Sequence, residues 1–363
     1  MSVISVQERP ETGKLRLPLG PALLVLLIAT IFSLLVLATN AWDPMVFVRL
    51  GTRYGHGDPD GTIGYDGQFA YQIALQPFDA APFLDIPPYR YQRVLYPLAA
   101  RIVALGQPAL IPWALVVLNL VALAVGTVAM SLILVKKGLS PWYALTVGIF
   151  AGQLVSLRLD LNEPFFLALA LLGIYAFESE RPRLGAGFLA LSMLSKETAI
   201  AFVAGYLIYF FFKRRWRSFF ETAVISLGPF LILQLVIWLN FGEIGLRSGG
   251  QGATPFSLIP FGGLLAFGLA DTTTLTTVLI ILGPLVLLPC LALTVSLFNF
   301  FSRPAFLPVA IILALHVLMM VTLPFSTYVD LPGVLRLTSG LVVAAVAFAA
   351  ITRSRKMLNY ATL

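Results

Sequence analysis

The stretch Leu184–Phe212, LGAGFLALSMLSKETAIAFVAGYLIYFFF, is apolar along most of its length but carries Lys196 and Glu197 near its middle. A membrane-spanning helix needs about 20 apolar residues, so this stretch is long for one span and short for two. A lysine and a glutamate at the centre of a bilayer would be costly. We therefore expect two tilted or partly sunken helices, which meet at Lys196 and Glu197 near a vestibule on the outer face.

The rest of the chain has the composition of a membrane-embedded fold. Its 363 residues have a mean hydropathy of +0.91, and 11% are charged, whereas a soluble domain carries about a quarter. Together with the two helices of 184–212, the sequence predicts an all-α polytopic membrane protein of about ten transmembrane helices. It forms a single transmembrane domain over 1–363, without a separate soluble domain. The other predicted spans are 19–41, 110–135, 140–157, 164–177, 219–240, 274–298, 305–323 and 334–351.

Basic residues set the expected orientation. With ten spans, 15 of the 24 basic residues but only 5 of the 17 acids lie in segments that would face the cytoplasm, so every loop satisfies the positive-inside rule. Both termini are then cytoplasmic, whereas nine spans would place the basic run 213–217 outside. Because basic residues cluster at the ends of apolar runs, the net charge of +7 is a topology signal and does not indicate nucleic acid. The basic residues concerned are Arg9, Lys14, Arg16, Lys136, Lys137, Arg181, Arg183, Lys213, Arg214, Arg215, Arg217, Arg303, Arg353, Arg355 and Lys356.

The longest segment between predicted spans, 42–109, would be an outer loop that contains juxtamembrane helices. Asp43-Pro44 is a typical helix start. Tyr65, Phe69 and Ile73 are spaced for one helical face. The apolar part of 90–106 is too short to span the membrane, so we expect this helix to lie in the interface.

Acidic residues concentrate in the same segment, around GYDGQFAY at 64–71. Asp66 would lie in the first turn of a helix, where the dipole favours a negative charge. Fixed there, its carboxylate could act as a general base or as a metal ligand, or simply cap the helix. Asp58 and Asp60 have a D-x-D spacing that could chelate a divalent cation such as Mg²⁺ or Mn²⁺, although GDPDG is also a good turn.

Further charged residues are expected near the outer ends of the spans. Arg158, Asp160 and Glu163 in RLDLNEP either pair among themselves or line a cavity. Charges at membrane depth usually face a site or each other. We therefore expect a set of seven charged residues near the outer face to bind a substrate phosphate or sugar. Each also has a structural interpretation as an ion pair, a snorkelling side chain or part of an interfacial belt. This predicted substrate-binding set is Arg90, Arg93, Arg158, Glu163, Lys196, Glu197 and Arg336.

The motifs Tyr65-Asp66-Gly67-Gln68-Phe69, Tyr89-Arg90-Tyr91-Gln92-Arg93, Glu163-Pro164 and Lys196-Glu197-Thr198 resemble the GT-C superfamily of integral membrane glycosyltransferases, and nearest its bacterial YDGQF group. The resemblance covers roughly residues 20–215. It implies transfer of a sugar from a polyprenyl-phosphate donor on the outer face of the bacterial inner membrane. Asp66 matches the position of the base, inversion follows, and by analogy Lys196 and Arg336 would hold the donor phosphate. Some members use a divalent metal.

Two other functions remain open at this point. The chain could be a non-catalytic accessory or assembly subunit of a larger membrane complex, with membrane-protein partners and a GT-C-like fold. A lipid or ion transporter ranks last, because the second half carries no clear charge inside its spans. No serine elbow, HExxH motif or P-loop is present, and the cytoplasmic loops are too short for a nucleotide fold. Membrane lipids and a lipid-linked sugar are therefore the expected partners.

Overall fold

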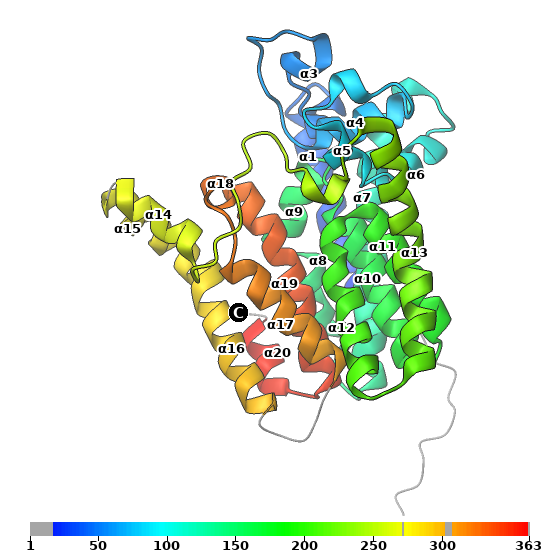
Figure 1. The fold of residues 1–363 in the computed structure, drawn as a ribbon, viewed down its shortest axis with the longest axis vertical. Helices are drawn as coiled ribbons and strands as arrows, with labels where there is room; N and C mark the ends of the chain where they lie inside the picture. The colour runs from blue at the N-terminus through cyan, green and yellow to red at the C-terminus, as the bar shows by residue number, and fades with distance from the viewer. Residues whose placement is uncertain (1–16, 271, 302–306, 362–363) are drawn as a thin grey trace, which may run out of the picture.

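The computed structural model describes residues 17–270, 272–301 and 307–361, and within these ranges the chain is helical without strands (Figure 1). The predicted all-helical class is thus confirmed. The predicted basic residues Arg9, Lys14, Arg16 and Arg303 lie outside the described residues.

A bundle of long helices forms the body of the molecule. Helix α7 packs against α1 and α10, α10 against α11, and α11 against α13, whereas α12 joins α13 to α17 and α19 lies between α17 and α9. The helices of the body are α1 Gly20–Ala38, α7 Ile111–Lys136, α8 Leu145–Gly148, α9 Ala151–Arg158, α10 Glu163–Glu178, α11 Pro182–Ser195, α12 Ile200–Phe212, α13 Trp216–Phe241, α17 Pro308–Val321 and α19 Leu331–Ile351.

Short helices cover one end of the bundle, which we call the α2–α6 end (top of Figure 1). They are α2 Met45–Val48, α3 Thr52–His56, α4 Gly67–Leu75, α5 Pro87–Tyr91 and α6 Leu95–Val103. The remaining helices are α14 Gly262–Ala270, α15 Thr272–Leu282, α16 Leu288–Phe301, α18 Phe325–Val329 and α20 Arg355–Ala361. Short 3₁₀ turns are η1 Ala81–Phe83, η2 Pro108–Leu110, η3 Pro141–Ala144, η4 Glu197–Ala199 and η5 Gly245–Arg247, and Gly283–Leu287 is a π-turn.

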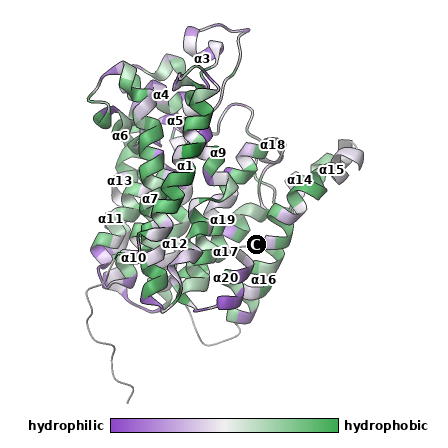
Figure 2. Cartoon of the chain, turned by 180° about the vertical axis from the view of Figure 1, so that it is seen from behind, coloured by the Kyte–Doolittle hydropathy of each residue, from purple (hydrophilic) through white to green (hydrophobic). Residues whose placement is uncertain are grey.

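Among the described residues, five helices are long and apolar enough to cross a membrane: Gly20–Ala38, Pro108–Lys136, Trp216–Phe241, Thr273–Phe301 and Leu331–Ile351. Two further apolar helices, Glu197–Phe212 and Pro308–Val321, are shorter. Hydrophobic residues cover the long helices, and hydrophilic ones gather towards the two ends (Figure 2). Such helices indicate a membrane protein, because their apolar side chains suit the lipid and their backbone N–H and C=O groups are hydrogen-bonded within the helix.

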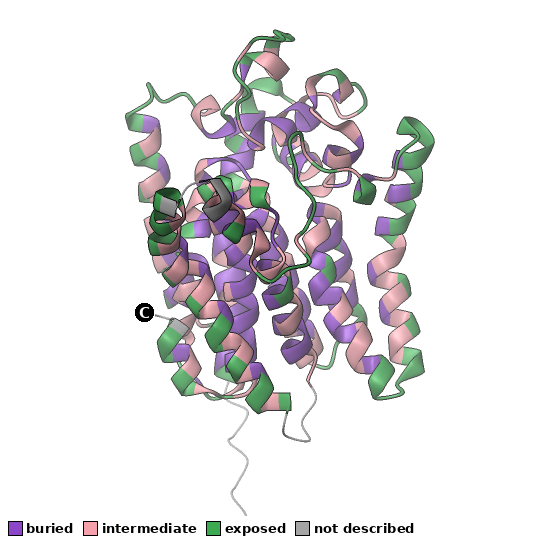
Figure 3. Cartoon of the chain, turned by 60° about the vertical axis from the view of Figure 1, so that its left-hand side comes forward, coloured by how far each residue is buried: buried purple, intermediate pink, exposed green. Residues whose placement is uncertain are grey.

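Burial separates the inner helices from the outer ones. Most residues of α19 are buried among its neighbours, whereas only a minority of the residues of α13 and of the Thr273–Phe301 helix are buried, and Figure 3 likewise shows buried residues in the inner helices. Exposed leucine, valine and phenylalanine side chains on these outer helices form the surface that lipid would cover.

The structure agrees with the prediction for the apolar stretch 184–212 and contradicts the prediction for 140–157. The stretch 184–212 does form two helices that meet at Lys196 and Glu197, because α11 ends at Ser195 and the backbone of Lys196 is extended. The prediction of one spanning helix over 140–157 is wrong. That run is divided into η3, α8 and α9, and the backbone at Phe150 is not helical.

Close packing gives a physical reason for the break before Phe150. A Cβ atom at Gly148 would lie 2.5 Å from both Thr127 and Val25, so this short piece sits directly against α7 and α1. The apolar residues of 140–157 therefore fill the bundle interior next to α7 and α19 and do not form a continuous span.

Candidate functional site

Asp66 directly precedes α4 at the α2–α6 end, and the backbone around it is fixed by a close approach of two segments. Leu50 and Gly64 form an isolated antiparallel bridge, and the Tyr65 N–H donates to the Arg49 carbonyl at 3.1 Å. Gly64 has φ of +72°, and a Cβ there would lie 2.5 Å from the Arg49 oxygen. Glycine is needed at this position both for the conformation and for the space.

The Asp66 side chain bridges two arginines from distant parts of the chain. Arg336 in α19 donates from Nη1 to Oδ2 at 2.6 Å, and Arg90 in α5 donates from Nη2 to Oδ1 at 3.0 Å. Burial alone would raise the pKa of Asp66, but the charges of Arg90 and Arg336 outweigh it and hold the pKa well below its ordinary value. The carboxylate is therefore ionised. It makes no capping hydrogen bond to α4, so the helix-cap alternative is wrong.

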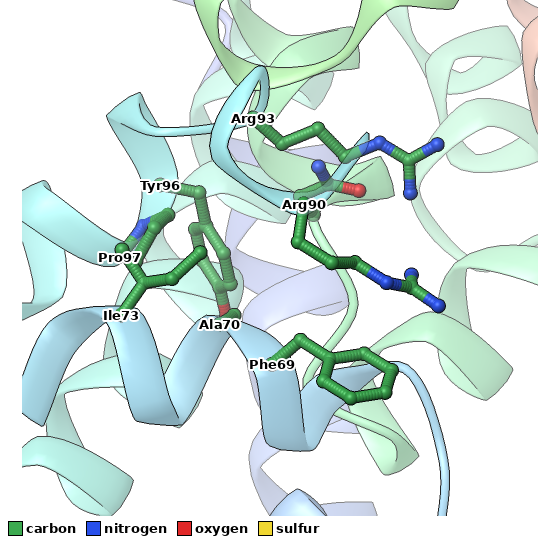
Figure 4. A pocket seen from close by; sticks show the side chains of 8 residues that line it. Phe69, Ala70, Ile73, Arg90, Arg93, Tyr96 and Pro97 are labelled. Atoms are coloured by element: carbon green, nitrogen blue, oxygen red, sulfur yellow. The ribbon is translucent and has the colours of Figure 1, made fainter. Parts of the chain in front are cut away.

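Arg90 is held in place by a second carboxylate and an aromatic ring. Its Nε and Nη2 both donate to Asp85 at 2.7 Å, and its guanidinium carbon lies 4.1 Å from the centre of the Phe69 ring (Figure 4). Asp85 also accepts the Gln251 N–H at 3.1 Å. Burial would raise the pKa of Asp85, but the hydrogen bonds and charge of Arg90 lower it overall. Such a bidentate pair fixes the direction of the guanidinium.

Arg93 makes the corresponding contact to the bundle. Its Nε donates to Glu197 Oε2 at 2.8 Å and its Nη2 to Oε1 at 2.5 Å, and its guanidinium lies 4.3 Å from the Tyr89 ring centre. Glu197 opens η4 immediately after the break at Lys196. Glu197, one of the two charged residues that interrupt 184–212, thus docks the α5 segment onto the body of the molecule.

Lys196 turns inward. Its Nζ donates to Oε1 of Glu163 at the start of α10, and both side chains are almost fully buried. Nε of Arg336 lies 3.8 Å from the same oxygen. This arrangement connects the α11–α12 break to α10 and α19, and so to Asp66.

These eight side chains form one charge-balanced cluster, which we call the central network. It contains four cations and four carboxylates, and Asp66 is the most accessible of the carboxylates, with 25% of its side chain exposed. A substrate that approached the cluster would meet this carboxylate first. The members are Asp66, Asp85, Arg90, Arg93, Glu163, Lys196, Glu197 and Arg336.

A small cavity of about 30 Å³ adjoins the network between α4, α5 and α6. Arg90 and Arg93 extend along one side of it, and Phe69, Ile73 and Tyr96 line the other (Figure 4). This volume accommodates a water molecule but not a sugar. In this conformation the network is closed around its own ion pairs.

The predicted mutual pairing within RLDLNEP is wrong. Glu163 pairs with Lys196, and Asp160 is buried without a hydrogen-bond partner among the described residues. Burial raises the pKa of Asp160 well above its ordinary value, which favours the neutral acid. Asp160 lies behind Gly67, where an added Cβ would be 2.2 Å from the Leu159 carbonyl oxygen. The backbone of Leu159 and Asp160 therefore packs against the turn that contains Asp66 and Gly67.

Arg158 belongs to a different cavity. It lines a groove of about 650 Å³ with Arg49, Asp43 and Asn40, outside the central network. The structure therefore brings together six of the seven residues of the predicted substrate-binding set and separates Arg158 from them.

Asp58 and Asp60 lie in an exposed turn. Oδ1 of Asp58 accepts the Asp60 N–H at 3.1 Å, which is the turn interpretation of GDPDG. Within the described ranges, no three His, Cys, Asp or Glu side chains are grouped closely enough to hold a metal ion. The hydrogen bond within the turn supports the turn interpretation, and a divalent-cation site at Asp58 and Asp60 stays a prediction.

Three features of the site were missed in the sequence. Asp85 precedes Arg90 by five residues, and this spacing was the available signal. Tyr65 donates to Asp330 at 2.6 Å, which ties the Asp66 turn to the start of α19. The segment around Gln251 lies over Arg90, and nothing in its glycine-rich sequence indicates that contact.

Comparisons with known proteins find no family model, no curated protein and no solved structure that matches this chain.

Proposed function

We propose that this protein is an integral membrane glycosyltransferase that moves a sugar from a polyprenyl-phosphate donor to an acceptor hydroxyl on the outer face of the membrane, with inversion. One observation carries the proposal: an ionised and partly exposed carboxylate, Asp66, is held between Arg90 and Arg336 at one end of an apolar helical bundle. Inverting displacement of a lipid phosphate from a sugar requires a base on one side of the anomeric carbon and cations for the phosphate on the other, and this site supplies both kinds of group close together.

In the proposed step, Asp66 takes the proton of the acceptor hydroxyl while the hydroxyl oxygen attacks the anomeric carbon. The bond from the anomeric carbon to the phosphate oxygen breaks, and its electron pair leaves with the polyprenyl phosphate. Attack from the face opposite the phosphate inverts the configuration. Guanidinium N–H groups of Arg90 and Arg336 would stabilise the charge on the departing phosphate.

The low pKa of Asp66 makes it a weak base while both arginines are bound to it. A donor phosphate competes for the same N–H groups. When it draws Arg336 or Arg90 away, the pKa of Asp66 rises towards its ordinary value and the carboxylate becomes a better base. Substrate binding would thereby activate the residue.

Entry of a donor needs an opening, because the adjoining cavity of about 30 Å³ is too small for a sugar. The segment between η5 and α14 is the element that covers Arg90. Gln251 donates to Asp85 and accepts from the Tyr54 hydroxyl, and Thr254 and Ser326 share three hydrogen bonds of 3.0, 3.1 and 3.1 Å. These are few and exposed contacts, so this segment can move at modest cost.

Transfer in reconstituted vesicles tests the proposal. The purified full chain is incorporated into vesicles with radiolabelled polyprenyl-phosphate sugars extracted from bacterial membranes, together with a membrane extract as the acceptor source. Labelled product is expected only with protein, and its anomeric configuration, read by NMR, should be opposite to that of the donor. Donor consumption equal to that of protein-free vesicles would reject the proposal.

The balanced charges of the central network favour a second candidate, a non-catalytic accessory or assembly subunit. Each of the four carboxylates of the network already has a cation, so the network can act as a lock between the α2–α6 segment and the bundle. Purification from native membranes separates the two candidates. A constant stoichiometry with another membrane protein, together with no transfer by the chain alone, would favour the subunit.

The proposed topology has ten crossings of the bacterial inner membrane, one of them made by the short pieces η3, α8 and α9 in place of a continuous helix, with both termini in the cytoplasm and the α2–α6 end outside. Cysteine labelling tests it in a Cys290→Ser background. Thr62→Cys should react with a membrane-impermeant maleimide in intact spheroplasts, and Lys213→Cys should react only after lysis. The reverse pattern would overturn the orientation.

A further inference from the structure

The groove formed by the ends of α1, α2 and α9 is the second charged feature of the α2–α6 end. It has a volume of about 650 Å³ and is lined by Asn40, Asp43, Met45, Val46, Arg49, Leu50 and Arg158. Arg49 and Leu50 also hold the backbone of the Asp66 turn, so the groove adjoins the segment that carries Asp66, although it shares no lining residue with the central network.

The two arginines of the groove differ from those of the central network in lacking a carboxylate partner. Neither Arg49 nor Arg158 forms an ion pair with any carboxylate in the described part of the chain, whereas Arg90, Arg93 and Arg336 each have one. The Asp43 carboxylate, which lines the same groove, accepts the Met45 N–H at 2.9 Å.

Arg158 has donors to spare. Its Nη1 donates to the Val46 carbonyl at 2.6 Å, and a guanidinium carries five N–H donors. This one contact fixes the side chain at the groove wall and leaves the other N–H groups free for a ligand. Burial and the nearby positive charge of Arg49 lower the pKa of Arg158, and the charge of Asp160 offsets part of this. An anion between Arg49 and Arg158 would offset the repulsion between the two guanidinium groups.

We propose that the Arg49–Arg158 groove binds a phosphoryl group, a phosphate mono- or diester, separately from the central network. A planar guanidinium with several free donors is the side chain best suited to phosphate oxygens. Two of them against one carboxylate leave the groove positively charged, and its volume admits a headgroup. The phosphate comes either from a lipid headgroup or from free phosphate. This inference does not rest on the proposed glycosyl transfer.

Lipid binding to the purified full chain tests the proposal. Native mass spectrometry measures how much dioleoyl phosphatidate, compared with dioleoyl phosphatidylcholine, stays bound in detergent, and a parallel titration uses inorganic phosphate. We expect phosphatidate to bind preferentially, and its affinity to fall about tenfold in Arg49→Gln and in Arg158→Gln. Arg49 is exposed and has no partner to lose, so its variant should fold normally.

Arg247→Gln is the matched control, because Arg247 is an exposed arginine on η5 that forms no ion pair with a described residue. It should bind phosphatidate as the wild type does. Phosphatidate binding assigns the phosphate to a lipid, and binding of inorganic phosphate alone, lost in the same variants, assigns it to free phosphate. Equal binding by wild type, Arg49→Gln and Arg158→Gln would overturn the proposal and leave Arg158 as an anchor for the Val46 carbonyl.

Discussion

The central network and the Arg49–Arg158 groove occupy the same end of the molecule, and both contain arginines. The arginines of the network are paired with carboxylates, whereas within the described ranges those of the groove are not. In the network, four cations meet four carboxylates beside a cavity of about 30 Å³. In the groove, two arginines face a space of about 650 Å³ without a carboxylate partner among the described residues. The first arrangement holds segments together, whereas the second leaves donors available.

The difference shows that arginine content alone does not identify a binding site. A paired arginine stabilises structure, and it becomes available only if a ligand replaces its carboxylate. An unpaired arginine at a groove needs no such exchange. The groove should therefore tolerate loss of charge, and the network should not.

Lys196→Met should give the largest loss of stability, because it leaves the buried Glu163 carboxylate with only Arg336, 3.8 Å away, as an ion-pair partner among the described residues. Breaking a buried pair from one side costs about 3–5 kcal/mol. The measurement is chemical unfolding in detergent, followed by tryptophan fluorescence. The double variant Lys196→Met/Glu163→Gln should recover much of the loss, and a double variant no better than the single one would count against a pairwise lock.

Gly67→Ala should come next. The new Cβ would lie 2.2 Å from the Leu159 carbonyl oxygen, so the Asp66 turn must move away from its support. Overpacking of this kind costs about 1–3 kcal/mol. Gly187→Ala in α11 is the control, since a Cβ there meets nothing within 4 Å. It should be neutral or slightly stabilising, and equal losses in the two variants would contradict the proposed close contact.

Low pH should weaken the ion pairs of the central network, because it protonates their carboxylates. The pKa of Asp85 is lowered in the folded state, so its contribution is present above the unfolded-state pKa of about 3.9 and is lost as the pH falls through the lower folded value. Asp85→Asn should therefore be less stable than the wild type at pH 7. The difference in stability between the two proteins should become smaller as the pH falls from 5 to 2.5. Melting temperatures across this range measure it, and a gap that widens in acid would contradict the assignment.

Arg49→Gln should have the smallest effect on stability, within about 0.5 kcal/mol, because the side chain is exposed and has no carboxylate to leave behind. The same unfolding experiment measures it beside Arg93→Gln, which strands Glu197 and should cost clearly more. Equal losses for the two variants would remove the distinction between network and groove.

Much of the network could be predicted from the sequence, because charges in an apolar chain are conspicuous. Lys196 and Glu197 had to break the helix of 184–212, and Asp66, Arg90 and Arg336 were each candidates. What the sequence lacks is the choice of partner. Lys196 pairs with Glu163 and leaves Glu197 to Arg93, and Arg158 donates to the Val46 carbonyl in α2. These choices depend on the packing of α10, α11 and α19, which hydropathy does not encode.

The break within 140–157 was not predicted for a related reason. A run of apolar residues is compatible with one spanning helix or with short buried pieces, and close contacts at Gly148 decide between them.

The most direct test of the central claim compares Asp66→Asn with Asp79→Asn in the vesicle transfer assay. Asp79 is an exposed carboxylate on the same segment, outside the network. If Asp66 is the base, its variant should lose transfer by about 100-fold or more while it still binds donor, and Asp79→Asn should retain wild-type rates. Wild-type transfer by Asp66→Asn would contradict the account.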